Sequence, residues 1–168
     1  PEGTDGLTGI EKLVFVDGSE NYDPLSHVAQ VSRLYEATLG RLPDALGLNG
    51  WAAQLDAGTV LSTVALGFTG SQEFQNTYGS LNDTQFVQQL YLNVLHRAAD
   101  SGGLTNWVNF LNAGHTRGEV VVGFSESQEN INNHAAQTNA GIWDIDETAA
   151  TVARLYWGTL ERAPDAGG

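Results

Sequence analysis

The residues of this chain that could do chemistry recur in a fixed order and spacing. A tyrosine is followed 6 positions later by an arginine, 9 positions later by an aspartate and 16 positions later by a tryptophan. Both complete copies and the start of a third are present: Tyr35, Arg41, Asp44 and Trp51; Tyr91, Arg97, Asp100 and Trp107; and Tyr156, Arg162 and Asp165. The complete copies are 56 positions apart. A constant offset across four residue types indicates duplication of one structural unit that packs against its neighbours.

The aspartates of this series have two chemical interpretations. Asp44 and Asp100 stand at the start of a predicted helix, where a carboxylate accepts hydrogen bonds from free backbone amides and faces the positive helix end. The alternative is calcium binding, which would need about six to eight oxygen ligands around each ion. Asp5 and Asp17, in the Gly-rich N-terminal segment, complete the set of candidate calcium ligands, although no EF-hand spacing is present.

The arginines need a local explanation, because the chain has only 7 Lys and Arg against 20 Asp and Glu. We expect Arg41 and Arg97 to bind carboxylates or the last carbonyls of the preceding helix, partners that suit a planar guanidinium. The alternative is that these arginines bind an anion or a glycan.

The aromatic residues of the series are predicted to be structural. Trp51 and Trp107 each stand three positions after one leucine and four positions before another, which places them on the apolar stripe of a helix. Both indole rings are therefore expected to be buried. Tyr35 and Tyr91 are expected in the core too, with each hydroxyl reaching a partner at its edge. The alternative, a platform on which sugar rings stack, would require the tryptophans to be exposed.

No arrangement typical of catalysis is present in the sequence. The 4 histidines lack His-x-x-x-His and His-Glu-x-x-His spacing, and neither a Gly-x-Ser-x-Gly motif nor a phosphate-binding glycine loop occurs. The complete lack of cysteine excludes disulfides, thiolate zinc sites and cysteine nucleophiles. The sequence therefore predicts a protein that is not an enzyme.

The 168 residues are strongly acidic, with a net charge of −13. Such a surface repels phosphate backbones and anionic lipid surfaces, so we expect no nucleic acid partner. No apolar run approaches the roughly 20 residues that a membrane-spanning helix needs, so no membrane insertion is expected. The acidity favours cation binding or simply solubility. The chain has no methionine, and we expect it to be an internal piece of a longer protein.

The elements that must position these residues are mainly helices. Residues 1–22 contain a short apolar run that ends in the turn signal Asp17-Gly18, and they are predicted to form one or two strands. Asp23 is predicted to cap the first helix, with Pro24 as its first residue. From there onward, apolar residues recur at steps of three and four, which is the period of a helix with one buried face.

Each unit is predicted to contain three helices. The helical domain spans 23–145, with a first unit at about 26–80, a second at about 82–134 and a connector after it. The third helix of the first unit, at about 60–78, is expected to be interrupted near Gly67 and Gly70. Residues 146–168 are expected to begin a third unit that is cut short. The expected fold class is all-α: tandem three-helix units that form a helical bundle, with a short β segment at the N-terminus.

The helical motifs are similar to those of a known family. They are Leu-Tyr, Leu-Gly-Arg-x-Pro-Asp, Gly-Leu-x-x-Trp and the Gly-Phe-x-x-Ser-x-Glu-Phe segment from Gly67 to Phe74. Together they resemble a bacterial helical family known only as domain of unknown function 4214, over about residues 26–134 with a restart at 146. The N-terminal segment, 1–22, resembles the flank of an upstream region of RTX-type (haemolysin-type) calcium-binding repeats, although the full Gly-Gly-x-Gly-x-Asp nonapeptide is absent.

The resemblance implies a role outside the cell. Members of that family often belong to large secreted proteins with RTX-type repeats, including surface-layer and adhesin-like proteins. We therefore expect a non-catalytic structural or interaction module of a larger secreted or cell-surface bacterial protein. Its partners would be the rest of that protein and a cell-surface glycan or protein, and calcium is the cofactor that this context favours. The alternatives are a glycan- or peptide-binding module that anchors the protein to the cell envelope, and part of a catalytic domain acting on a surface polymer.

Overall fold

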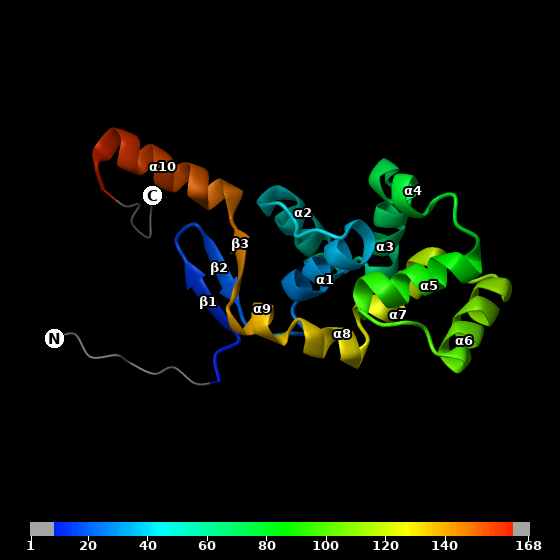
Figure 1. Ribbon diagram of the computed structural model, residues 1–168. Helices are drawn as coiled ribbons and strands as arrows, with labels where there is room; N and C mark the ends of the chain where they lie inside the picture. The colour runs from blue at the N-terminus through cyan, green and yellow to red at the C-terminus, as the bar shows by residue number, and fades with distance from the viewer. Residues whose placement is uncertain (1–8, 163–168) are drawn as a thin grey trace.

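The computed structural model describes residues 9–162 and shows a mostly helical protein with a small antiparallel sheet (Figure 1). The strands are β1 (Lys12–Phe15), β2 (Gly18–Asn21) and β3 (Ile142–Ile145). The helices are α1 (His27–Leu39), α2 (Ala45–Asp56), α3 (Leu61–Thr69), α4 (Gln72–Tyr78), α5 (Asp83–Val94), α6 (Ser101–Asn112), α7 (Arg117–Ser125), α8 (Gln128–Asn133), α9 (Ala135–Asn139) and α10 (Glu147–Leu160). The mainly helical class with a β segment near the N-terminus is as the sequence predicts.

The two units repeat in structure as they do in sequence. Helices α2 and α6 have the same length, as do α3 and α7, and the members of each pair begin 56 positions apart. Each unit has four helices where three are predicted, because the predicted third helix is broken in two. In the first unit the break falls at Gly70, and Ser71 then caps α4. Gly67 stays inside α3, so the predicted interruption at that glycine is wrong.

Polar caps set most helix starts. At the N-terminus of eight helices, the side-chain oxygen of a capping residue accepts a hydrogen bond from a backbone amide of the first turn. The capping residues are Ser26, Asp44, Ser71, Asn82, Asp100, Thr116, Ser127 and Asp146. The prediction that Asp23 caps α1, with Pro24 as the first helical residue, is wrong. Asp23 instead accepts the Leu25 amide in the preceding turn, and Ser26 caps the helix. The turn through Pro24 uses the carboxylate locally, so the helix starts later in the chain.

The two units share one hydrophobic core. Helix α3 packs against α7, and α1 packs against both α5 and α7. Val31 and Leu34 of α1, Leu90 of α5 and Val121 of α7 are all 0% exposed. Because burying such a side chain contributes about 1.5–3 kcal/mol, contacts of this kind hold the units together as one domain.

A buried ion pair also joins the units. Arg33 of α1 is 1% exposed, and its guanidinium donates hydrogen bonds of 3.1 and 2.5 Å to Glu126, which directly follows α7. It donates a third, of 2.8 Å, to the Pro24 carbonyl. A buried charge is tolerated only when it is paired and hydrogen-bonded, so loss of Glu126 would leave Arg33 uncompensated.

The sheet joins the two ends of the helical region. Strands β1 and β2 form an antiparallel hairpin whose turn is Val16-Asp17, one position before the predicted Asp17-Gly18, because Gly18 already pairs with Phe15 as the first residue of β2. Strand β3 pairs antiparallel with the other edge of β2, placing Ile145 opposite Gly18. Asn49 of α2 donates to the Ile145 carbonyl at 2.8 Å. The sheet is therefore attached to the first helical unit.

This arrangement differs from the organisation that the sequence predicts. The sequence assigns residues 1–22 to a flank and the residues after 134 to a connector, whereas the structure pairs strands from both segments and forms α9 within the connector. The sequence does not predict this pairing because β3 has only 4 residues and its partner β2 lies far away in the sequence. The Asn21 side chain reaches the Ile142 carbonyl across 121 positions, a contact that no local pattern encodes.

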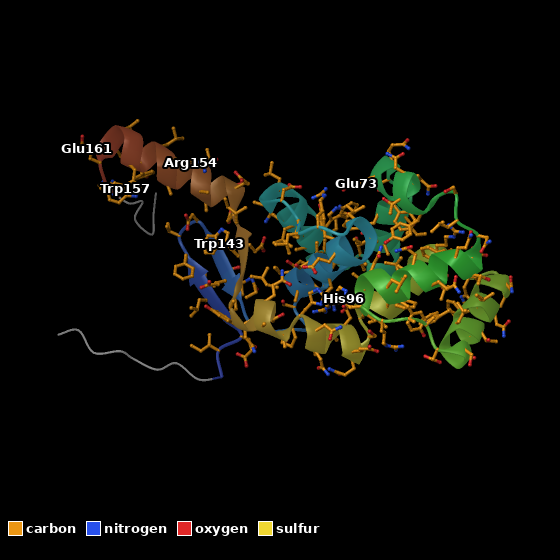
Figure 2. All side chains as sticks on the ribbon, viewed as in Figure 1. Glu73, His96, Trp143, Arg154, Trp157 and Glu161 are labelled. Carbon is orange, nitrogen blue, oxygen red and sulfur yellow. The ribbon has the colours of Figure 1, made fainter. Side chains whose placement is uncertain are left out.

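Helix α10 lies at one end of the molecule and α6 lies at the other (Figure 1). Helix α10 follows β3, is capped by Asp146, contacts β2 and buries Ala150 and Ala153. Figure 2 shows the side chains of Arg154 and Trp157 on this helix, away from the main helical core. No helix within residues 9–162 combines the length and apolar character that a membrane span requires.

Candidate functional site

The recurring polar residues of the first unit meet at one corner. The guanidinium of Arg41 lies 5.3 Å from the centre of the Tyr35 ring and donates hydrogen bonds of 2.8 and 3.1 Å to Glu73. Asp44 caps α2 by accepting the Gly47 amide at 2.8 Å. The Tyr35 hydroxyl lies so close to Gly47 that any side chain there would collide with it. We call this arrangement of Tyr, Arg, Asp, Gly and Glu an arginine corner.

The second unit forms the same arginine corner. Arg97 lies 4.9 Å from the centre of the Tyr91 ring and donates hydrogen bonds of 2.7 and 2.9 Å to Glu129. Asp100 accepts the Gly103 amide at 2.7 Å. The sequence predicts carboxylate partners for these arginines but does not identify them. The available signal is the repeated Ser-Gln-Glu triplet, which places a glutamate 32 positions after each arginine.

The arginine–glutamate pairs of both corners lie at the protein surface, with about 41–47% of each side chain exposed. Each guanidinium lowers the pKa of the glutamate that it binds, Glu73 in the first unit and Glu129 in the second. Burial raises the pKa of the tyrosine hydroxyl at each corner, that of Tyr35 and that of Tyr91. These shifts move both kinds of group away from neutral pH, which is the opposite of what general acid–base catalysis needs.

The repeated aspartates act as helix caps, the first of their two predicted roles. The carboxylates of Asp44 and Asp100 each accept an amide from the glycine three positions later. Asp17 lies at the hairpin turn, where its backbone carbonyl accepts the Asp146 amide at 2.9 Å, and Asp5 lies outside the described residues. Within residues 9–162, no group of three or more acidic or histidine side chains could hold a metal ion.

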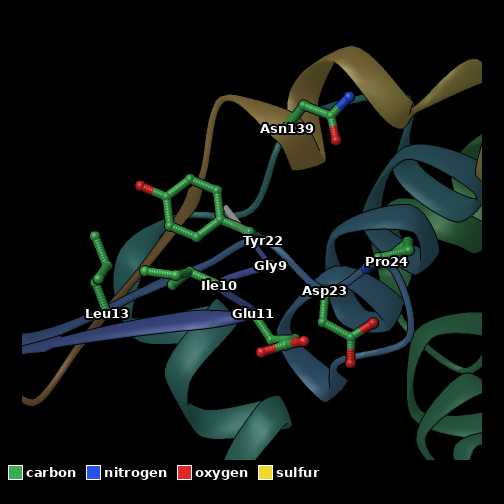
Figure 3. A pocket seen from close by; sticks show the side chains of 8 residues that line it. All are labelled: Gly9, Ile10, Glu11, Leu13, Tyr22, Asp23, Pro24 and Asn139. Carbon is green, nitrogen blue, oxygen red and sulfur yellow. The ribbon is translucent and has the colours of Figure 1, made fainter. Parts of the chain in front are cut away.

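Two carboxylates line a hollow of about 550 Å³ between the start of β1 and the chain that enters α1 (Figure 3). They belong to Glu11, directly before β1, and Asp23, shortly after β2, and the side chain of Tyr22 also lines the hollow. The Asp23 carboxylate is engaged by a backbone amide, and the Tyr22 hydroxyl donates to Glu20 at 2.8 Å. Two carboxylates fall short of the about six to eight oxygens that calcium takes.

The tryptophans are half-buried, whereas the sequence predicts that both are fully buried. The ring centre of Trp51 is 5.2 Å from that of Phe68, and a Cβ added at Gly67 would lie 2.7 Å from the indole. Trp107 lies against Gly123 in the same way. Each tryptophan packs against the core and retains an accessible side. The period of a helical stripe predicts the direction of a side chain but not how deeply it is covered.

The second unit presents an aromatic surface that the first unit lacks. The rings of Phe110 and His115 stack in parallel with centres 3.6 Å apart, and Trp107 meets Phe110 edge-on at 5.8 Å. A hollow of about 450 Å³ opens beside them, lined by Gly103, Asn106, Trp107 and Phe110. The first unit has different residues at the positions of Asn106, Phe110 and His115, namely Gly50, Gln54 and Thr59.

A histidine–aspartate pair lies outside every sequence motif. Nδ1 of His27 is 2.5 Å from Oδ1 of Asp56, 29 positions away, and Asp144 lines the same hollow of about 330 Å³. Burial raises the pKa of Asp144. Ser26 also lines this hollow, but its hydroxyl donates to one backbone group and accepts from another as it caps α1. The pair therefore has a neighbouring hydroxyl that is already engaged, unlike the activated serine of a hydrolase.

Comparison with known proteins connects both units to a family. The sequence profile described as "Domain of unknown function (DUF4214)" matches residues 17–76 and 65–134, which correspond to the first and second units. No curated protein and no solved structure matches this chain. The matching profile indicates no catalytic family, so the role of the chain has to be argued from its own contacts.

Proposed function

Because this chain belongs to the family described as a domain of unknown function (DUF4214), a membership that assigns no activity, we propose a role from its own contacts. In this proposal it is a non-catalytic structural or interaction module of a larger secreted or cell-surface bacterial protein of the surface-layer or adhesin type. The rest of that protein is its main partner.

The observation that carries the proposal is how the repeated polar residues are used. At each arginine corner, the guanidinium binds a glutamate of the same unit and the aspartate caps the following helix. The residues that recur at fixed spacing therefore serve the folding of each unit. In repeat proteins, the residues that recur in every copy typically stabilise the fold, and the residues that differ between copies contact partners.

The composition supports a location outside the cell. A net charge of −13 favours solubility in surroundings rich in salt and divalent cations. A chain with 0 cysteines needs no disulfide to fold, so its stability is independent of the redox state of its compartment.

Localisation of the full-length protein tests the proposed role. An antibody against the helical units should label intact cells or detect the protein in the culture medium. A cytoplasmic enzyme measured in the same fractions serves as the control for lysis. Recovery of the full-length protein entirely from the cytoplasm would contradict a secreted or surface location.

The aromatic hollow of the second unit favours a second candidate function, which is glycan binding. Ligand pockets combine apolar or aromatic walls with a few polar groups, and here Trp107 and Phe110 supply the rings while Asn106 supplies an amide. The net charge of −13 favours a neutral sugar over an acidic one. The arginines, which the sequence offers as an alternative basis for glycan binding, are already held by Glu73 and Glu129.

The chain itself supplies the variant that tests this second function. Phe110→Gln combined with His115→Thr gives the second unit the residues of the first, so the variant is expected to fold. On an array of neutral oligosaccharides, the original chain should bind and the variant should bind at least about tenfold more weakly, a loss of about 1.4 kcal/mol. Gln54→Ala in the first unit is the matched control and should bind normally. Glycan binding is ruled out if the original chain binds no sugar, or if the double variant binds equally well.

A further inference from the structure

Helix α10 exposes an apolar face that its counterparts bury. Leu34 of α1 and Leu90 of α5 are 0% exposed, whereas Leu155 at the same position of α10 is 59% exposed. The leucine five positions later shows the same contrast: Leu95 is 8% exposed and Leu160 is 54% exposed. Single exposed leucines are ordinary in proteins. Two of them, at positions that are buried or partly buried in the complete units, indicate a surface that nothing within residues 9–162 covers.

The rest of α10 already has the geometry of the first helix of a unit. The residue that follows the helix, Glu161, has a φ of 52°, close to the 64° of Gly40 and the 53° of His96. The guanidinium of Arg162 lies 5.2 Å from the centre of the Tyr156 ring, compared with 5.3 and 4.9 Å in the complete units. The part of an arginine corner that the first helix contributes is therefore formed in α10 as well.

The complete units show which helices of the same unit pack on the first helix. The second helix of each unit packs along the first, α2 along α1 and α6 along α5. The third helix of each unit places a phenylalanine ring edge-on to the tyrosine ring of the corner. The ring centres of Phe68 and Tyr35 are 4.8 Å apart, and those of Phe124 and Tyr91 are 4.9 Å apart. A glutamate 32 positions after the arginine completes the corner.

We propose that the apolar face of α10, formed by Leu155 and Leu160, is the docking surface for the second, third and fourth helices of a third repeat unit, supplied by the polypeptide that continues from α10. Residues 163–168 read Ala-Pro-Asp-Ala-Gly-Gly, in which Asp165 and Gly168 match Asp44 and Gly47 of the first unit. The docked helices carry a phenylalanine opposite Tyr156 and a glutamate opposite Arg162. The inference rests on the proposed role of the chain as a repeat module, and it identifies the partner of one end of that module.

Charge favours this covalent source over a second copy of the chain. Two chains that each have a net charge of −13 repel one another when they associate. Helices joined to α10 by a short turn, in contrast, have a high effective concentration at its surface.

The test completes the unit with sequence that the chain already contains. Residues 48–80 of this chain are appended after Gly168, which is equivalent to Gly47, so that the new segment is in register. Amide hydrogen exchange of α10 is then compared between the original and the extended chains. In the extended chain, the amides from Val152 to Leu160 should exchange at least about tenfold more slowly.

Two controls separate docking from a mere increase in length. Leu155→Ser in the extended chain removes an apolar contact of α10 and should restore most of the original exchange rate there, while exchange in α1 and α5 stays unchanged. An appended segment with the same composition in scrambled order should give no protection. Equal exchange of α10 in the original and the extended chains would overturn the proposal.

Docking of a second copy is a distinct outcome. If exchange of α10 in the original chain slows with rising protein concentration, and sedimentation shows a dimer, the occupant is another copy and the covalent proposal is overturned. The experiment measures only the folding of α10. Its failure would leave the localisation of the full-length protein unaffected, so the two proposals can fail separately.

Discussion

At the scale of single residues, the position directly before the arginine of the corner is left-handed in all three copies. Gly40, His96 and Glu161 have φ values of 64°, 53° and 52°. A residue with a Cβ is strained in this region by roughly 1–2 kcal/mol, whereas glycine is not. Gly40, in the first copy, is therefore the residue type that this backbone geometry favours, whereas His96 and Glu161 are strained.

His96→Gly should therefore stabilise the protein. We expect a gain of up to about 1 kcal/mol in the free energy of unfolding, after the greater freedom of glycine in the unfolded chain is subtracted. Gly40→Ala is the converse control. It meets nothing within 4 Å, so the loss of about 1 kcal/mol that we expect would come from the backbone alone. Urea denaturation measures both variants, and a His96→Gly protein less stable than the original would contradict this account.

His134, which lies between α8 and α9, connects α1 to α8 through its two ring nitrogens. Its Nε2 lies 2.7 Å from Oε2 of Glu36, and its Nδ1 lies 2.9 Å from the Asn130 carbonyl oxygen. Both partners are acceptors, so both nitrogens can donate only when the imidazole is protonated. The hydrogen bond with Glu36 accordingly raises the pKa of His134.

This raised pKa has a defined effect on stability. The stabilisation is fully present below the unfolded-state pKa of about 6.5 and is lost as the pH rises through the higher folded-state value. The melting temperature of the original chain should therefore exceed that of His134→Gln by more at about pH 5.5 than at about pH 8.5. Glu36→Gln should weaken the same dependence. A difference between the original chain and His134→Gln that is constant over this range would show that the pair does not titrate as described.

At the scale of helices, two glycines make room for the half-buried tryptophans. A glycine inside a helix costs about 1 kcal/mol relative to alanine, so its presence needs a packing reason. An added Cβ at Gly67 would lie 2.7 Å from the Trp51 ring, and one at Gly123 would collide with Trp107. Gly50, inside α2, has nothing within 4 Å of an added Cβ. It is therefore a matched control within the same fold.

Alanine substitutions at these three glycines should change the stability of the protein in opposite directions. Gly50→Ala should stabilise the protein by about 0.5–1 kcal/mol, because it improves helix propensity without a clash. Gly67→Ala and Gly123→Ala should each destabilise it by about 1–3 kcal/mol, because the indole has to move. Thermal unfolding of the three variants measures this. Stabilisation by all three would mean that the tryptophans do not pack on these glycines.

The sequence predicts the helices because their signals are local. The apolar stripes of α1 and α5 repeat within one turn, and the caps Asp44 and Asp100 act on amides three positions away. Strand β3 is not predicted, because 4 residues within an Asn-, Ala- and Gly-rich segment show too little of a period. Its partner β2 also lies at the far end of the chain.

The difference between local signals and contacts over long sequence separations also explains how much of the candidate site the sequence predicts. Each arginine corner can be anticipated from repeated spacing, except for the identity of its glutamate. The pair of His27 and Asp56 joins residues 29 positions apart, and the buried pair of Arg33 and Glu126 joins residues 93 positions apart. No helical or strand period operates over such separations, so these contacts follow only from the packed fold.

At the scale of the whole molecule, the net charge of −13 makes stability sensitive to cations. Screening of carboxylates should raise the melting temperature equally for calcium and magnesium at matched ionic strength. A specific calcium site should add a saturable rise for calcium alone. Because Asp44 and Asp100 are engaged as helix caps, we expect equal melting curves for the two ions. A saturable preference for calcium over magnesium, with chelator as the reference, would instead indicate a site.

We propose that the chain is a series of one repeated unit, in which the apolar face of α10 has no cover within residues 9–162. Native-state hydrogen exchange of the unmodified chain tests this claim most directly. Helices α1 and α5 should exchange only through global unfolding, because Leu34 and Leu90 are 0% exposed. Helix α10, in which Leu155 is 59% exposed, should open locally and exchange far faster. Protection of α10 equal to that of α1 and α5 would contradict the claim.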